Sequence, residues 1–134
     1  EGEASRGTDP GEAARFARET GVDAMAISVG NTHLQTTAGG GLDEARIAEI
    51  AALTQTPLVI HGGSGVPHDQ RRRLATGTSI CKFNIGTELR QVFGAAIRQT
   101  LATDPEVYDR IAILSALHDP LSEAARAVIR GLRP

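Results

Sequence analysis

The segment PLVIHGGSGVP, residues 57–67, decides the fold of this chain. Its apolar start is typical of a strand buried on both faces, and the strand ends directly in His61, two glycines, a serine and a third glycine. A strand that only has to pack could end on any turn. This one delivers an imidazole and a cluster of backbone N–H groups to one point, which indicates a metal ligand beside a phosphate-binding loop.

Strands and helices alternate on both sides of this segment. Each short apolar run is followed by a stretch with apolar residues at helical spacing. Strands are predicted within 22–30, 58–60 and 79–85, and helices at 9–21, 43–54, 67–77, 87–104, 105–117 and 120–132. Alternation of this kind predicts a parallel sheet with right-handed crossovers, and therefore an α/β fold.

The number of strands limits the architecture. Three strands cannot close a barrel, and an open sheet would leave apolar edges exposed. A small doubly wound domain is one possibility, and a piece of an eightfold barrel of about 250 residues is the other. The start, EGEASRGTDP, lacks an initiator Met, and extra helices follow the last strand. We expect residues 1–134 to be the C-terminal portion of a TIM (β/α)8 barrel, its last three βα units plus C-terminal helices, with the N-terminal half absent.

The composition is that of one globular domain. Of 134 residues 40% are hydrophobic and 22% charged, and the formal net charge of -2 gives no electrostatic case for nucleic acid or a membrane as partner. The single cysteine, Cys81, suits a reducing compartment, so a cytoplasmic location is expected. Because Cys81 lies in an apolar run, we expect a buried thiol. The basic run at 71–73 is expected to be a solvated helix face.

Two histidines are candidate metal ligands. His33 follows the first predicted strand and His61 ends the second, about one βα unit later. Neighbouring strand ends lie ~4.8 Å apart, so two imidazoles there can converge on one ion at the Zn–N distance of ~2.1 Å. The alternative, in which one or both are only hydrogen-bonded at a strand end, stays open. We expect His68 and His118 to lie at the surface.

The glycines after His61 form the first candidate phosphate loop. Gly62 and Gly63 lack a Cβ, so the backbone there can adopt positive φ and approach a ligand closely. Successive N–H groups in such a turn form an anion nest, which the positive end of the next helix reinforces. Ser64 adds a hydroxyl donor. An ordinary tight turn is the alternative.

The segment NIGTE, residues 84–88, repeats this device one unit later. Asn84 ends the third strand, Gly86 permits the turn, and Thr87 is expected to cap the next helix and to contact the same phosphate. Barrels place a phosphate at the loops after strands 7 and 8, so two consecutive loops of this kind predict a phosphate site.

Three segments together resemble a known family. SVGNTH (28–33), PLVIHGGSG (57–65) and CKFNIGTEL (81–89), in this order and spacing, resemble the C-terminal half of the class II, zinc-dependent ketose-bisphosphate aldolases. Fructose- and tagatose-bisphosphate aldolases are the best-known members. The resemblance implies a TIM barrel that reversibly cleaves a ketose 1,6-bisphosphate into dihydroxyacetone phosphate and an aldehyde phosphate, in carbohydrate metabolism and glycolysis.

The resemblance also implies roles for particular residues. His33 and His61 would be two of three protein ligands to Zn²⁺, which would polarise the ketone carbonyl and stabilise the enediolate. A monovalent cation, Na⁺ or K⁺, is usual near the phosphate loops, and the family forms homodimers or homotetramers. The residues that would contact the substrate are Gly62, Ser64 and Thr87 at its phosphate and Asn84 near its reacting carbons.

This chain departs from the family pattern in two ways. Leu34 stands where the family commonly has glycine, which puts one backbone contact to the phosphate in doubt. The third histidine and the proton-transferring aspartate belong to the absent N-terminal half, so no catalytic residue is assigned and the piece alone is expected to be inactive. Two rival functions remain: a non-catalytic sugar-phosphate-binding α/β module, and a metal-dependent hydrolase on a barrel.

Overall fold

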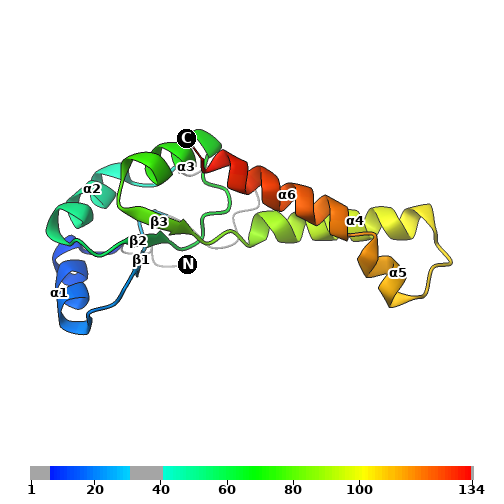
Figure 1. The fold of residues 1–134 in the computed structure, drawn as a ribbon, viewed down its shortest axis with the longest axis horizontal. Helices are drawn as coiled ribbons and strands as arrows, with labels where there is room; N and C mark the ends of the chain where they lie inside the picture. The colour runs from blue at the N-terminus through cyan, green and yellow to red at the C-terminus, as the bar shows by residue number, and fades with distance from the viewer. Residues whose placement is uncertain (1–6, 31–40, 134) are drawn as a thin grey trace, which may run out of the picture.

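A computed structural model describes residues 7–30 and 41–133 of the chain, and it contains a three-stranded parallel sheet with helices between the strands (Figure 1). The sheet order is β1-β2-β3, and both pairs of strands are parallel, as the alternation predicted. The elements are α1 (Pro10–Thr20), β1 (Met25–Ile27), α2 (Glu44–Leu53), β2 (Leu58–Ile60), α3 (His68–Gly77), β3 (Ile80–Phe83), α4 (Thr87–Thr103), α5 (Arg110–Ser115) and α6 (His118–Gly131).

Local capping signals set the bounds of α1. The carboxylate of Asp9 accepts a hydrogen bond from the backbone N–H of Glu12 at 2.9 Å, and Pro10 occupies the first helical position. Gly21 ends the helix in the left-handed region at φ 64°. The helix with its two caps therefore occupies the range 9–21 predicted from the sequence.

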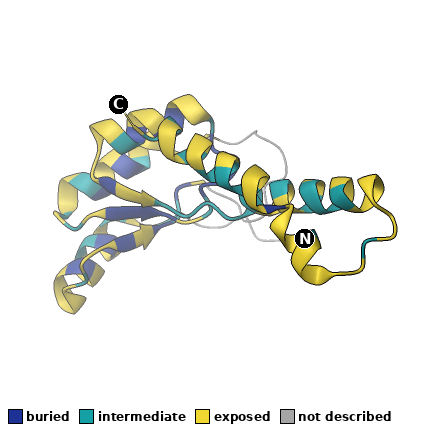
Figure 2. Cartoon of the chain, turned by 45° about the vertical axis from the view of Figure 1, so that its right-hand side comes forward, coloured by how far each residue is buried: buried dark blue, intermediate teal, exposed yellow. Residues whose placement is uncertain are grey.

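The core lies between one face of the sheet and the helices α1, α2 and α3, and Figure 2 shows the buried residues gathered there. Alternate strand residues point into it, as the pleat requires. The core side chains contributed by these elements are Met25, Ile27, Leu58, Ile60 and Ile80 from the strands and Ala13, Ala17, Ile47, Ile50 and Leu74 from the helices.

The opposite face of the sheet carries Ala26, Val59 and Lys82, which are paired in register across the three strands. Ala26 and Lys82 on the two outer strands are exposed, whereas Val59 on the central strand is buried but is not part of the core cluster under the helices. A doubly wound domain has helices on both faces, whereas a barrel has helices outside and packs its inner face against the other strands. The observed arrangement is that of a barrel portion.

Cys81 corrects one expectation, because it is exposed rather than buried. The register between β2 and β3 shifts at Leu58 and Val59, which pair with Ile80 and Lys82 and leave Cys81 without a direct partner. Such a bulge re-aims the extra side chain. The Cys81 thiol lies 3.5 Å from the Leu58 carbonyl oxygen at this edge.

The three C-terminal helices α4, α5 and α6 form an arm that extends away from the sheet (Figure 1). Helices α4 and α6 pack along each other. The helix expected at 105–117 is shorter than predicted, because Asp104 and Asp109 organise a turn before α5 by accepting from the amides of Glu106 and Ile111. No helix in the described residues is both long and apolar enough to cross a membrane.

A polar network on the outer surface joins α2 to α3. The carboxylate of Glu44 accepts hydrogen bonds from the Gln70 side-chain amide at 2.8 Å and from the Arg73 guanidinium at 3.0 Å. The Gln70 hydrogen bond, followed by that from Arg73, lowers the pKa of Glu44 below its ordinary value. Arg73 also pairs with Asp69 at 2.6 Å. Both pairs are largely exposed, so they add little to stability.

Candidate active site at the carboxyl ends of the strands

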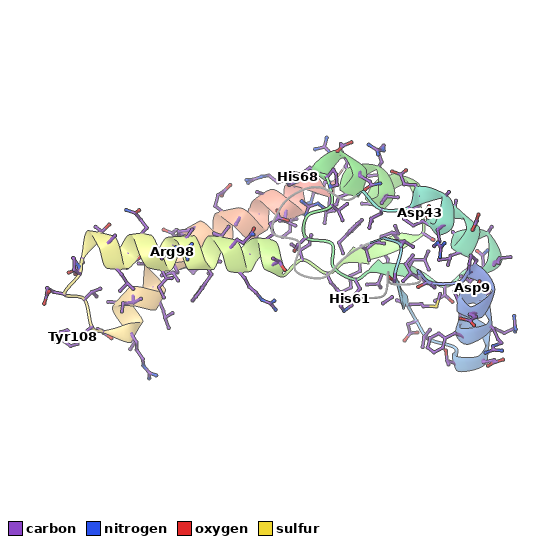
Figure 3. The ribbon with its side chains drawn as sticks, turned by 180° about the vertical axis from the view of Figure 1, so that it is seen from behind. Asp9, Asp43, His61, His68, Arg98 and Tyr108 are labelled. Atoms are coloured by element: carbon purple, nitrogen blue, oxygen red, sulfur yellow. The ribbon has the colours of Figure 1, made fainter. Side chains whose placement is uncertain are left out.

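His61 follows the last residue of β2 directly and is exposed. Gly62 comes next at φ 78°, so the predicted positive φ is present at this glycine. Figure 3 shows His61 beside the sheet, whereas His68 lies at the start of α3 and is exposed, as expected. His33 and Leu34 lie outside the described residues. The convergence of His33 and His61 on one ion therefore stays a prediction.

Gly63 holds the loop after β2 against the end of β3. Its amide donates to the carbonyl oxygen of Asn84 at 2.9 Å. A Cβ added at Gly63 would lie 3.3 Å from the Phe83 Cβ and 3.4 Å from the Asn84 oxygen, so the approach is close. Gly63 thus contacts the neighbouring strand, and its amide hydrogen is used within the fold.

Replacing Gly63 with alanine is expected to lower the free energy of unfolding by about 1–3 kcal/mol, because the added methyl group overpacks against Phe83 and the main chain of Asn84. Urea unfolding measures this. Gly77→Ala is the matched control, since a Cβ at Gly77 meets nothing within 4 Å. Equal midpoints for the two variants would show that the loop moves freely to admit the methyl group.

Ser64 connects the two glycine-containing loops. It is buried, and its hydroxyl oxygen accepts hydrogen bonds from the backbone amides of Gly86 at 3.2 Å and Glu88 at 3.3 Å. The expectation that Thr87 caps α4 is wrong: Gly86 is the N-cap without a side-chain cap, and Thr87 is the first helical residue. An N-cap side chain would accept a hydrogen bond from the Glu88 amide. That amide already donates to the hydroxyl oxygen of Ser64, which belongs to the neighbouring loop.

Gly86 also differs from its prediction. Its φ is -125°, which any residue adopts, so the turn does not require glycine for conformational reasons. Its amide hydrogen is used by Ser64. Asn84 is half-buried and uses both main-chain groups, since its amide donates to the Ile60 oxygen at 2.9 Å. The predicted contact of the Asn84 side chain with substrate stays a prediction.

Several donors remain at this edge. A hydroxyl accepts two hydrogen bonds and donates one, so Ser64 retains its hydrogen after accepting from two amides. Within residues 7–30 and 41–133, the amides of Gly62, Ser64 and Thr87 donate to no other described residue. We call these three amides and the Ser64 hydroxyl the phosphate cradle. Amides on a turn and at a helix start are suited to an anion.

Gln70 and Arg71 were not identified from the sequence as residues of this region. Gln70 is 7% exposed, and its side-chain amide both accepts from the Leu42 amide at 2.8 Å and donates to the Leu42 oxygen at 3.0 Å. Arg71 is 3% exposed, which corrects the expectation of a fully solvated basic run. Both residues precede Leu74 by three or four positions, so helical spacing from that apolar residue could have predicted their burial.

The described residues contain no group of three or more His, Cys, Asp or Glu side chains that could hold a metal ion. His61 fits zinc by the chemistry of its imidazole and by its exposure at a strand end. One imidazole is too few for a zinc site, so zinc binding would require further ligands from His33 or from outside this chain.

A parallel sheet with helices on one face, and with glycine-containing loops at the carboxyl ends of its strands, is typical of a portion of a TIM-type barrel. The model of the family "Fructose-bisphosphate aldolase class-II" matches residues 1–133, and the chain belongs to this family. This confirms the resemblance seen in the three sequence segments.

A solved structure supports the same assignment. The chain is similar to the YdjI aldolase from Escherichia coli K12, known from an X-ray crystal structure, with a TM-score of 0.77 and 28% sequence identity. The match covers 94% of this chain and 46% of that chain, so the chain spans less than half the length of that aldolase. The similarity confirms the prediction of a partial barrel.

Proposed function

We propose that this chain provides the phosphate-binding part and some of the metal ligands of a class II aldolase. The reaction would be the reversible cleavage of a ketose 1,6-bisphosphate into dihydroxyacetone phosphate and an aldehyde phosphate. The observation that carries the proposal is the Ser64 hydroxyl, which joins the loops after β2 and β3 into one cradle. Membership of the class II aldolase family supports it.

The cradle would hold the phosphate of the dihydroxyacetone portion. The amides of Gly62, Ser64 and Thr87 and the Ser64 hydroxyl are donors, and the N-terminus of α4 adds a favourable dipole. Gly63 and Gly86 would act indirectly, because their amides hold the two loops together. The sequence predicts Gly63 and Gly86 among the phosphate-binding residues, Gly63 for close approach to the ligand and Gly86 for the turn.

Zinc would be held by His61 and His33, with a third ligand from outside this chain, and when bound it would polarise the ketone carbonyl of the substrate. Asn84 would hydrogen-bond the substrate near its reacting carbons, and Na⁺ or K⁺ would lie near the phosphate loops. No residue here is assigned a proton-transfer role. We therefore propose that the 134-residue chain alone binds sugar phosphate without turning it over.

The experiment titrates the chain with dihydroxyacetone phosphate and, separately, with inorganic phosphate, each with zinc and with a chelator. We expect zinc to strengthen dihydroxyacetone phosphate binding about tenfold, because only this ligand offers a carbonyl to the metal, and to leave phosphate binding unchanged. A coupled aldol-cleavage assay should show no turnover. Equal affinity for the sugar phosphate in both buffers would instead support the non-catalytic binding module.

The arm suggests how copies of the chain associate. Apolar side chains on α4, α5 and α6 are exposed, including Phe93, Leu101, Ile111, Leu114 and Ile129. Exposed apolar surface of this kind is typical of protein contacts. We propose a homodimer or homotetramer formed through these helices, and a cytoplasmic location in keeping with the single cysteine.

A further inference from the structure

Arg71 is a buried charge on α3, the helix that follows the loop of His61. Its side chain is 4% exposed, and Nη1 lies 3.0 Å from Oε2 of Glu88 on α4. Its second amino group, Nη2, lies 3.2 Å from Nδ1 of His68. Taking a guanidinium out of water is costly unless the charge is paired, so this position is specified by its partners.

The partner of Arg71 belongs to the first turn of α4. Glu88 is the second residue of that helix, and its own backbone amide donates to the Ser64 hydroxyl oxygen at 3.3 Å. A single residue is thus bound by its side chain to α3 and by its main chain to the cradle. The ion pair with Arg71 and the hydrogen bond to Ser64 therefore meet at one residue in the first turn of α4.

Helix α4 is joined to α3 in two ways. Helix α6 packs against both α3 and α4. The Arg71–Glu88 pair connects the two helices directly, at the first turn of α4. The α4 helix has no buried residue, so polar contacts contribute to the placement of its start.

We infer that Arg71 is a positioning residue for the phosphate cradle. Through Glu88 it keeps the amides of Gly86 and Glu88 on the Ser64 hydroxyl oxygen, so that the hydroxyl hydrogen and the Thr87 amide stay available for a phosphate. Hydrogen bonds accepted by a hydroxyl oxygen polarise the hydroxyl, so the two amides also make the Ser64 hydroxyl a stronger donor. The inference rests on the proposed phosphate binding. The placement of the Gly86 and Glu88 amides on Ser64 can be measured without a ligand.

The test compares Arg71→Met, Glu88→Gln and Arg73→Met in the 134-residue chain. Methionine keeps the length of the arginine stem and removes its charge. Arg73→Met is the matched control, because Arg73 lies on the exposed side of α3 and pairs there with Asp69 of α3 and Glu44 of α2. Glu88→Gln weakens the same ion pair by changing its partly exposed partner. This variant therefore still gives a result if Arg71→Met folds poorly.

Two quantities are measured: hydrogen exchange of the Gly86 and Glu88 amides, and the dissociation constant for inorganic phosphate. In Arg71→Met and Glu88→Gln we expect exchange about tenfold faster and phosphate binding about tenfold weaker, the equivalent of one weakened charge-assisted hydrogen bond. Arg73→Met should change neither. Lower stability with unchanged exchange and affinity would overturn the inference and leave Arg71 with a structural role.

The two proposals fail in different ways. If the unmodified chain binds no phosphate, the proposed function fails on that measurement alone. Hydrogen exchange of the Gly86 and Glu88 amides then still tests whether Arg71 positions these amides on Ser64. Equal exchange rates in Arg71→Met and Arg73→Met would overturn that role of Arg71.

Discussion

Replacing His61 with alanine is expected to lower the affinity of the chain for zinc about a hundredfold, because a site with two imidazoles becomes a site with one. His61 is exposed directly after β2, on a turn fixed by the positive φ of Gly62. Both features place the ring at the edge where parallel strands present ligands. Competition with a chromophoric zinc indicator measures the affinity.

His118→Ala is the control for this substitution. His118 is also exposed, but it lies on the arm and contacts Asp119 at 2.9 Å. It should leave zinc affinity unchanged, whereas His33→Ala should reproduce the loss seen for His61→Ala, and the double variant should lose little more. Zinc affinity that is indifferent to His61, or that falls equally with His118→Ala, would contradict the metal site.

The elements of the fold could be predicted from the sequence because their signals are local. Asp9, Pro10 and Gly21 bound a helix within a few residues of themselves, and three short apolar runs between helices leave a parallel sheet as the simplest arrangement. The positive φ of Gly62 is likewise a local property of a tight turn after a strand.

The features that the sequence did not predict depend on contacts between units. Cys81 is exposed because it follows the core residue Ile80 on an outer strand and so lies on the other face of the sheet, away from the described helices of the core. Thr87 has no capping role because the acceptor for α4 comes from Ser64, in the preceding unit. Arg71 looked like part of a solvated run because the charge that pairs with it, on Glu88, lies in the next helix.

Replacing Ser64 with alanine is expected to weaken inorganic phosphate binding about tenfold to a hundredfold. A hydrogen bond to a charged group contributes about 1.5–3 kcal/mol, and the amides of Gly86 and Glu88 lose the atom that orders them. Because those two amides lose their acceptor in a part-buried place, the free energy of unfolding should also fall, by about 1–3 kcal/mol. Calorimetric titration and urea unfolding measure the two effects.

Ser79→Ala is the matched control for Ser64→Ala. Ser79 is exposed between α3 and β3, at the other end of the strands, and it bonds Leu58 through its main-chain oxygen at 2.9 Å. The same loss of a hydroxyl there should alter neither quantity. If Ser64→Ala lowers stability yet keeps full phosphate affinity, the hydroxyl only caps α4. If the Ser64 hydroxyl donates to the ligand, the loss of phosphate affinity should exceed the loss of unfolding free energy. If it only caps α4, both quantities should fall together, because each depends on the start of that helix.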